Sequence, residues 1–294
     1  MANTIDWGQG AVNNTIGWGK GKTNATNNWG SIYDSTAAGE TNITGGGGVD
    51  ADAQAFVTNA GIVDQVEANA INNLVIGLKA DGLWTKMDVI YPMVGSTATS
   101  NSYNLKNTAT NQLTFSGGWT HSSTGAKPNG TNAYANTGYN PSVTASLNSH
   151  HLSYYSRTNS NGTEVEIGTY PGGSYDLLEL RTSGTTYFLI NQNGTTSSFS
   201  DSNSQGFYIG NRTASNVING WKNGSKVVNS SVASNILPNG TLFLGALNQG
   251  GALYYSTKEC AFASIGDGLT DTDASNLNTR VTTFQTALNR NVWN

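Results

Sequence analysis

Short segments with the two-residue periodicity of β-strands constrain the fold of this chain more than any other feature. Eleven of them follow one another without a helical pattern between them, and turns rich in Gly, Asn and Ser separate them. Strands without intervening helices exclude a βαβ arrangement and predict an antiparallel sandwich. Asn223-Gly224, between two of the segments, is a strong hairpin signal. The segments are 89–94, 112–115, 151–156, 163–168, 175–181, 185–191, 206–210, 217–222, 226–228, 241–244 and 261–265.

Helical periodicity precedes these strands in the stretch 51–86, which we interpret as a helical connector. Asp64 and Glu67 form an N-cap with an acidic third residue, and Gly82 ends the helix. We expect the helix to pack on the edge of the sandwich. Its apolar face consists of Val63, Ala70, Ile71, Leu74, Val75 and Leu78.

A second helical pattern follows the last strand. It starts with Asp271 and Asp273, whose negative charges suit a helix N-terminus. Its apolar positions are Leu277, Val281, Phe284 and Leu288. The region 87–294 is therefore predicted to be an all-β sandwich closed by one C-terminal helix.

The N-terminal stretch 1–44 repeats itself in a way that the rest of the chain does not. Trp7, Trp18 and Trp29 are each followed by Gly, and successive tryptophans are eleven residues apart. A period of eleven is compatible with a helix, but the residues between are mostly Gly, Asn and Thr, which are poor helix formers. The pattern favours an extended arm, joined to the rest of the chain by a glycine hinge at 45–50.

Three indoles on so polar an arm need a surface on which to dock. A regular series of Trp-Gly steps suits a repeating partner surface, or a symmetric bundle of arms around an axis. The alternative is that the tryptophans dock back onto their own chain. We prefer the partner surface and assign Trp7, Trp18 and Trp29 as attachment residues.

Composition limits the partners. Only 11% of the 294 residues are charged and the net charge is −4, so the chain has no basic patch for nucleic acid, whereas a neutral glycan is easily accommodated. The N-terminus has neither a basic start nor an apolar core, and no apolar run of 18 residues occurs later, so we expect neither a signal peptide nor a membrane span. The single cysteine, Cys260, permits no intramolecular disulfide and suits folding in a reducing cytoplasm.

Two parts of the sequence resemble known protein families. The run 18–43, WGKGKTNATNNWGSIYDSTAAGETNI, resembles the Trp-Gly-rich N-terminal segments with which tailed-bacteriophage structural proteins attach to the virion. The stretches 113–137, 146–157, 218–227 and 261–274 resemble the concanavalin A-like lectin/glucanase sandwich found in phage virion proteins. The second resemblance implies a jelly-roll β-sandwich with one or two flanking helices, a scaffold used for carbohydrate binding and, in some relatives, for carbohydrate cleavage.

Glu164 and Glu166 are the sharpest catalytic candidates. On a strand they would share one face, with Cα atoms about 6.6 Å apart, which suits the close carboxylates of a retaining glycosidase. The related glucanases, however, carry an E-x-D-x-x-E pattern, and here Glu166 occupies the third position and Thr169 the sixth. We therefore interpret the pair as two charges on a solvated sheet face.

Metal binding has little support in the sequence. His150 and His151 are adjacent, so a strand would send them to opposite faces, and His121 and Cys260 are isolated. The loop 267–271 could offer oxygen ligands to calcium, but a turn before an N-capped helix accounts for the same residues without a metal. We expect no metal and no other cofactor.

Flat aromatic rings in polar turns are the candidates for glycan contact, because a sugar ring has an apolar face and a rim of hydroxyls. Adjacent aromatic pairs such as Tyr154-Tyr155 would send one ring inward from a strand. The candidates are Trp119, Tyr134, Tyr139, Tyr170, Tyr175 and Trp221.

Together these features lead to one hypothesis and two alternatives. The chain is expected to be a phage virion surface protein, as a head fibre, capsid decoration or tail-fibre component that folds in the host cytoplasm. It would attach to other virion proteins through its arm, form a homo-oligomer with a trimer favoured, and display a sandwich for cell-surface glycans. The alternatives are a glycan-cleaving depolymerase and a structural decoration without a ligand.

Overall fold

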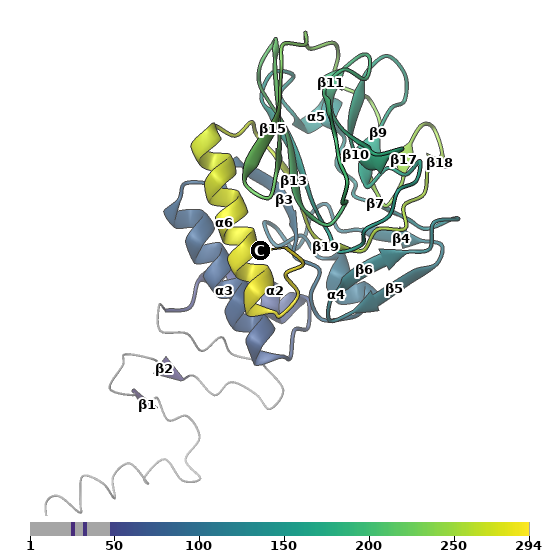
Figure 1. Ribbon diagram of the computed structural model, residues 1–294. Helices are drawn as coiled ribbons and strands as arrows, with labels where there is room; N and C mark the ends of the chain where they lie inside the picture. The colour runs from purple at the N-terminus through teal and green to yellow at the C-terminus, as the bar shows by residue number, and fades with distance from the viewer. Residues whose placement is uncertain (1–24, 27–31, 34–47, 294) are drawn as a thin grey trace, which may run out of the picture.

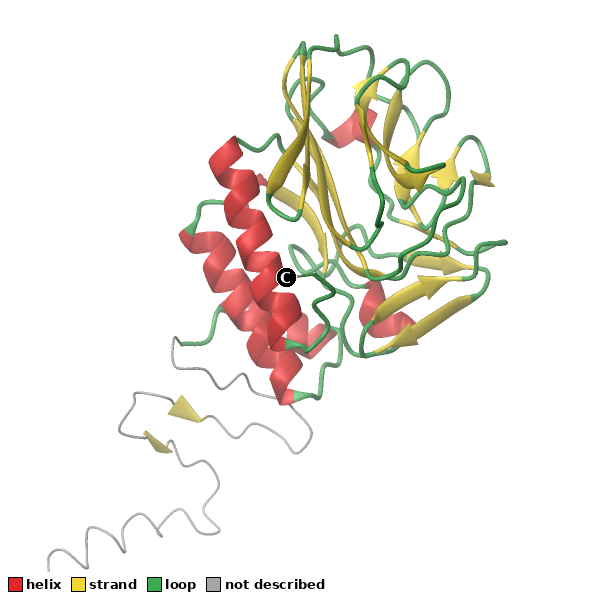
Figure 2. Cartoon of the chain, in the orientation of Figure 1, coloured by secondary structure: helices red, strands yellow, loops and turns green. Residues whose placement is uncertain are grey.

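Two antiparallel sheets packed face to face, with helices against one of them, form the fold (Figures 1 and 2). The computed structural model describes residues 48–293, and in the N-terminal segment only the backbone pairing of β1 (Ala25–Thr26) with β2 (Ile32–Tyr33). The predicted attachment residues Trp7, Trp18 and Trp29, the rest of the arm 1–44 and most of the glycine hinge lie outside the described residues. The predicted antiparallel sandwich is confirmed.

The first sheet has eight strands. Its centre is β8 (His150–Ser156), hydrogen-bonded to β13 (Gly206–Ala214) on one side and to β19 (Cys260–Gly266) on the other. Outward from β13 lie β14 (Val217–Lys222) and β15 (Ser225–Ser230). On the free edge of β19 lie β3 (Met87–Tyr91) and the hairpin of β5 (Trp119–Ser122) and β6 (Gly125–Pro128).

The second sheet has nine strands, most of them short. Its longest members are β10 (Tyr175–Thr182) and β11 (Thr185–Gln192), and all its pairings except that of β17 with β9 are antiparallel. The remaining strands are β12 (Ser198–Ser200), β9 (Ile167–Thr169), β16 (Phe243–Leu244), β7 (Tyr134–Asn136), β4 (Thr114–Ser116), β17 (Leu247–Asn248) and β18 (Ala252–Leu253).

The inner faces of the two sheets enclose a dry core. Alternation along β10 and β11 sends Leu178, Leu180, Phe188 and Ile190 inward, where they meet Tyr154 of β8 and are fully buried. Glycines in the opposite sheet make room for these large side chains. A Cβ on Gly220 would lie 2.4 Å from the Phe188 ring, so the close approach of the two sheets there requires glycine.

Three long helices cover the other face of the eight-stranded sheet: α2 (Ala51–Asn59), α3 (Gln65–Ala80) and α6 (Asp271–Ala287) (Figure 2). Their apolar faces pack on Tyr155, Phe207, Ile209 and Phe262 and form a second core. The helices lie on the face of the sheet, so the expectation that the helix of 51–86 packs on the edge of the sandwich is wrong. An exposed row of large apolar side chains on this sheet requires a covering layer, and the helices supply it.

The helix boundaries follow the signals in the sequence. The Asp64 carboxylate accepts the backbone N–H of Glu67 at 2.9 Å, and Gly82 has a φ of +71° just after α3. Thr270 and Asp273 form a reciprocal capping box at the start of α6. Val63 is a wrong assignment, because it precedes the cap and is 78% exposed. Among the described residues no helix is both long and apolar enough to cross a membrane.

Two short helices and a 3-10 turn complete the fold. The helices are α4 (Ala98–Ser102) and α5 (Pro141–Thr144), and a 3-10 turn, η2 (Trp84–Lys86), precedes β3. The Asn223-Gly224 hairpin is confirmed, with φ values of +51° and +78°. The predicted strand 163–168 is wrong over its first four residues, because β9 begins only at Ile167.

Candidate functional site

The outer face of the nine-stranded sheet is an apolar surface bordered by tyrosines. Because Leu178 and Phe188 point inward, their neighbours Leu177 and Leu189 point outward, and both are nearly buried together with Val165 and Leu247. The side chains that cover them are Tyr170, Tyr175 and Tyr187, each partly exposed. The arrangement leaves aromatic rings between the apolar sheet face and water.

Two of these rings stack on each other. The centroids of Tyr170 and Tyr175 lie 3.9 Å apart and their planes differ by 11°. A second stacked pair, Tyr134 and Phe243, has a centroid distance of 4.6 Å. The neighbours of the second pair, Ala135 and Leu244, belong to the core between the sheets, so alternation places Tyr134 and Phe243 on the outer face as well.

We call the surface formed by Tyr170, Tyr175, Tyr187, Tyr134 and Phe243 the aromatic face. Exposed side chains extend it at its border. Tyr254 is 47% exposed and Leu253 is 45% exposed, at β18 and the loop that follows it. The Tyr254 carbonyl accepts the backbone N–H of Val165, so this loop is fastened to the sheet. Burial and the neighbouring Tyr170 and Tyr254 raise the pKa of the Tyr175 phenol, which therefore remains a neutral hydroxyl near pH 7. The face can offer flat apolar surfaces together with hydroxyl groups.

The structure places the other predicted glycan contacts elsewhere. Tyr139 is 1% exposed and its hydroxyl donates to Asp88, while Trp221 is 4% exposed beneath the helices. Both are core residues, and their assignment to a ligand surface is wrong. Trp119 is half-buried, and its indole N–H donates to the carbonyls of Ser116 and Tyr134.

Sequence reasoning missed Tyr187, Phe243 and Tyr254. The signal for Tyr187 was present, since it lies two residues before Leu189 on the same strand face. Phe243 and Tyr254 could not be assigned, because the strands beside them are only two residues long and have no measurable period.

Glu164 and Glu166 flank the buried ammonium of Lys258. The Lys258 Nζ lies 3.0 Å from Glu164 Oε2 and 3.0 Å from Glu166 Oε1. The side chains of Lys258 and Glu166 are 0% exposed and that of Glu164 is 11% exposed. The interpretation as a solvated sheet face is therefore wrong, because the two charges are buried around a shared partner.

Hydrogen bonds occupy the carboxylates further. Glu166 accepts the Leu180 backbone N–H at 2.6 Å and the Ser256 hydroxyl at 3.1 Å, and Glu164 accepts the Thr257 backbone N–H at 2.8 Å. The cluster fastens the chain before β9 to the segment before β19. A substrate oxygen has no access to Glu166, so the arrangement joins segments of the chain rather than forming an open catalytic pair.

One ammonium cannot compensate two buried carboxylates, and the two acids respond oppositely. Burial raises the pKa of Glu166 to about 7, with Lys258 acting in the other direction. Burial also acts to raise the pKa of Glu164, but the Thr257 amide and Lys258 outweigh it, so that pKa lies below its ordinary value. Glu164 is therefore the carboxylate that keeps its charge.

Two of the three histidines form hydrogen bonds within the core. His150 bonds to Asp176 between the sheets at 2.9 Å, and His151 bonds to the Asp267 carbonyl at 2.6 Å. Cys260 is buried as well. The loop 267–271 leads into the capped start of α6, as expected. Within residues 48–293 no three His, Cys, Asp or Glu side chains gather in a way that could hold a metal ion.

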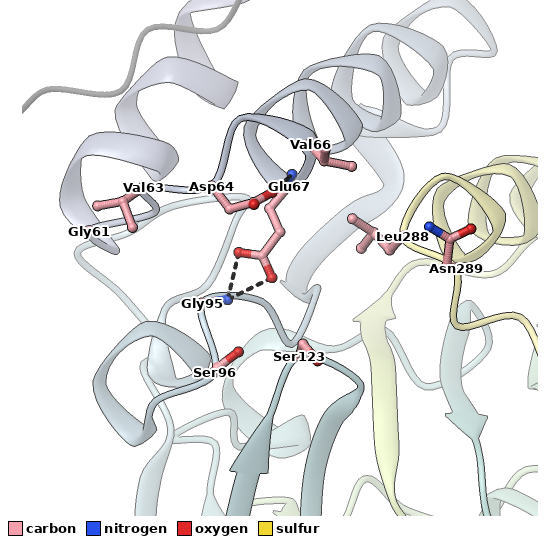
Figure 3. Close-up of a pocket in the computed structure, with 10 residues that line it drawn as sticks. All are labelled: Gly61, Val63, Asp64, Val66, Glu67, Gly95, Ser96, Ser123, Leu288 and Asn289. Atoms are coloured by element: carbon pink, nitrogen blue, oxygen red, sulfur yellow. Dashed lines mark hydrogen bonds between the residues drawn. The ribbon is translucent and has the colours of Figure 1, made fainter.

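A cavity of about 430 Å³ lies on the helical side of the molecule (Figure 3). It opens between the start of α3, the loop after β3, the β5–β6 turn and the end of α6. Figure 3 shows the Glu67 carboxylate directed at the backbone N–H of Gly95, with Val66 and Leu288 to one side. No residue of the aromatic face lines this cavity.

No family model and no curated protein matches this sequence. Among solved structures, the NanB sialidase from Streptococcus pneumoniae is similar at 16% identity and a TM-score of 0.35, over 44% of this chain and 23% of that chain. Domain 4 of AbnA, an extracellular arabinanase from Geobacillus stearothermophilus in complex with arabinotriose, is similar at 13% identity and a TM-score of 0.42, over 65% of this chain and 98% of that chain.

A mutant of Trypanosoma rangeli sialidase is similar at 11% identity and a TM-score of 0.48, over 74% of this chain and 39% of that chain. This chain therefore spans less than a quarter of the NanB chain and well under half of the Trypanosoma rangeli chain. These three neighbours are two sialidases and one domain of an arabinanase.

The Glu166 carboxyl makes stability depend on pH in a predictable direction. Its pKa rises from 4.5 to about 7 on folding, so its contribution is fully present below pH 4.5 and is lost as the pH rises to 7. We expect the free energy of unfolding to fall more steeply between pH 5 and 7 in the wild type than in Glu166→Gln, as measured by urea denaturation.

The same pair of proteins provides the control for this prediction. Well above pH 7 the carboxyl is ionised in both the folded and the unfolded state, so the difference in stability between the two proteins should no longer change with pH. Equal slopes in the two proteins between pH 5 and 7 would contradict the assignment of the raised pKa to Glu166.

Proposed function

We propose that this protein binds carbohydrate on the outer face of the nine-stranded sheet. The observation that carries the proposal is the stacked pair Tyr170 and Tyr175, which lies beside Tyr187 on an apolar face that the helices do not cover. A tyrosine ring stacks on the apolar face of a sugar, and its hydroxyl bonds to the sugar's own hydroxyls. Such a shallow surface suits weak binding, near millimolar or about −4 kcal/mol per site.

We infer that the protein does not cleave the carbohydrate it binds. In most glycosidase families one carboxyl protonates the leaving oxygen and a second attacks the sugar or activates water, and both must reach the substrate. Glu166 is fully buried, and Lys258 pairs with both Glu164 and Glu166. These contacts support a binding protein over the depolymerase alternative.

We propose further that the protein is displayed on a phage virion. Support comes from the Trp-Gly repeats of the arm, which resemble virion attachment segments. Display of many copies converts weak sites into strong attachment, because later contacts form at high effective concentration. A homotrimer, with arms meeting around an axis, is the assembly that we favour.

The carbohydrate proposal predicts the behaviour of a double variant. Tyr170→Ala with Tyr175→Ala should weaken the binding of bacterial surface polysaccharide by about tenfold per site, since it removes roughly 1.4 kcal/mol of stacking. Binding is measured on a glycan array and by titration of the best ligand. Tyr103→Ala, a partly buried tyrosine on the helical side, is the matched control and should bind as the wild type does.

Two outcomes would contradict the proposal. Unchanged binding by the double variant, with an unchanged melting temperature, would exclude the aromatic face as the binding surface. Release of new reducing ends from the polysaccharide, abolished in Glu164→Gln, would show catalysis instead.

The virion proposal predicts where the protein is found. Antibody labelling of purified particles in the electron microscope should detect the full chain, and Trp18→Ala should lower the number of copies per particle without lowering the melting temperature of the sandwich. Mass measurement of the wild type in solution should give an oligomer. Particles without label, or a Trp18→Ala protein that assembles at wild-type level, would overturn attachment through the arm.

A further inference from the structure

Six Asn-Gly pairs occur in this chain, and all of them lie in the part that the structure describes. Such a pair is chemically reactive, because glycine has no side chain to shield its backbone nitrogen from the side-chain amide of the preceding asparagine. Four of the pairs are also followed by Thr, so their local chemistry is the same and the fold must distinguish them. These four begin at Asn129, Asn161, Asn193 and Asn239, and the other two begin at Asn219 and Asn223.

The reaction open to an Asn-Gly pair is an intramolecular acyl transfer. The glycine nitrogen loses its proton to water and bonds to the side-chain carbonyl carbon of asparagine, and the side-chain nitrogen takes a proton from water and leaves as ammonia. Water then opens the five-membered imide ring and gives aspartate or isoaspartate, so the net change is amide and water to carboxylate and ammonium. The two reacting atoms must approach to about 3 to 3.5 Å, so an asparagine side chain that is held elsewhere reacts more slowly.

Hydrogen bonds hold the side chains of three of these asparagines away from the following nitrogen. The side-chain oxygen of Asn129 accepts three backbone N–H groups of its own loop at 3.0 to 3.2 Å. That of Asn161 accepts the Gly184 N–H at 2.8 Å. That of Asn223 accepts the Phe207 N–H, also at 2.8 Å. Each of these bonds must break before the ring can close.

Two further asparagines are restrained in other ways. The side-chain oxygen of Asn239 accepts from the Asn140 amide and from the Ser142 hydroxyl, both at 3.0 Å. Asn219 lies inside β14 and is 7% exposed. The pairings of β14 with β13 and β15 fix the backbone on both sides of Asn219, so the extended strand would have to open for the reaction.

Asn193 differs from the other five. It is exposed in the turn after β11, and within residues 48–293 its side chain has no hydrogen-bond partner. The Gly194 N–H likewise has no partner in that range, whereas the Gly194 carbonyl accepts from the Gln192 side chain at 2.9 Å. Apart from its chain neighbours, no atom lies within 4 Å of the position that a Cβ on Gly194 would take. The turn therefore has room for the ring to form.

We propose that Asn193-Gly194 is a site of spontaneous deamidation that reacts ahead of the other five Asn-Gly pairs in the folded protein. The product carries one more negative charge, so the net charge changes from −4 to −5. The new charge lies one residue beyond Gln192, which pairs with Tyr175 across the sheet. The inference is independent of carbohydrate binding, because the reaction uses no contact of the aromatic face.

Peptide mass spectrometry of the full chain during incubation at mildly alkaline pH tests this order of reaction. All six pairs are read in one sample, and a second sample unfolded in urea gives the rate of each pair without the fold. A hydrogen bond that must break first lowers the rate by roughly twofold to tenfold. We therefore expect Asn193 to react severalfold faster in the folded protein than the other three Asn-Gly-Thr asparagines, and all four to react at similar rates in urea.

Two variants provide controls. Asn193→Gln should suppress the more acidic form of the protein in isoelectric focusing, because glutamine would have to close a six-membered ring. Asn140→Ala with Ser142→Ala removes the hydrogen bonds to Asn239 and should raise the rate of Asn239 toward that of Asn193.

Three results would overturn the proposal. The first is another Asn-Gly pair that reacts before Asn193 in the folded protein. The second is equal rates at the four Asn-Gly-Thr sequences in the folded protein. The third is an unchanged rate of Asn239 in the double variant, which would show that hydrogen bonds to the side chain do not select the reacting pair.

Discussion

Burial of both faces of the central strands of the eight-stranded sheet is the constraint on which the rest of the structure depends. Every residue of β8 is buried, because Tyr154 points into the core between the sheets and Tyr155 into the core under the helices. A strand buried on both sides cannot present a ligand surface. The helices cover one sheet, whose central strands are therefore enclosed. The other sheet keeps an outer face whose tyrosines are in contact with water, and this is the sheet face that can bind a ligand.

Buried charges join the segments that this layering brings together. Lys258 holds the chain before β9 through Glu164 and Glu166. Arg290, 1% exposed, donates to the carbonyls of Pro92, Met93 and Ala261 and so ties the end of the chain to the ends of β3 and β19. Only 11% of the residues are charged, and these two buried cationic side chains each connect segments that are distant in sequence. Removing Lys258 would leave the buried carboxylates without a counter-charge, which typically costs about 3 to 5 kcal/mol.

Local signals in the sequence predicted much of this fold. The periodicity of 217–222, the Asn223-Gly224 turn and the cap at Asp64 all lie where expected, because each depends on neighbouring residues alone. The number of layers could not be predicted in that way. Whether Tyr155 and Trp221 face water or a helix depends on a segment distant in sequence that covers them.

The candidate site shows the same division. Tyr170 and Tyr175 were predicted from their polar turns, and the structure brings them together in one stack. Tyr139 and Trp221 have similar neighbours in sequence but lie in the core, so ring type and turn composition do not separate surface from interior. The Lys258 partner of Glu164 and Glu166 lies more than ninety positions away and had no local signal.

Oxidative footprinting by hydroxyl radicals, read out by mass spectrometry on the full chain, tests the two-sided burial most directly. We expect Tyr154, Tyr155 and Trp221 to remain unmodified, while Tyr254, which is 47% exposed, should be readily oxidised. Oxidation of Tyr155 or Trp221 at the rate of Tyr254 would show that the helices do not cover the eight-stranded sheet, and would contradict the assignment of the ligand surface to the other sheet.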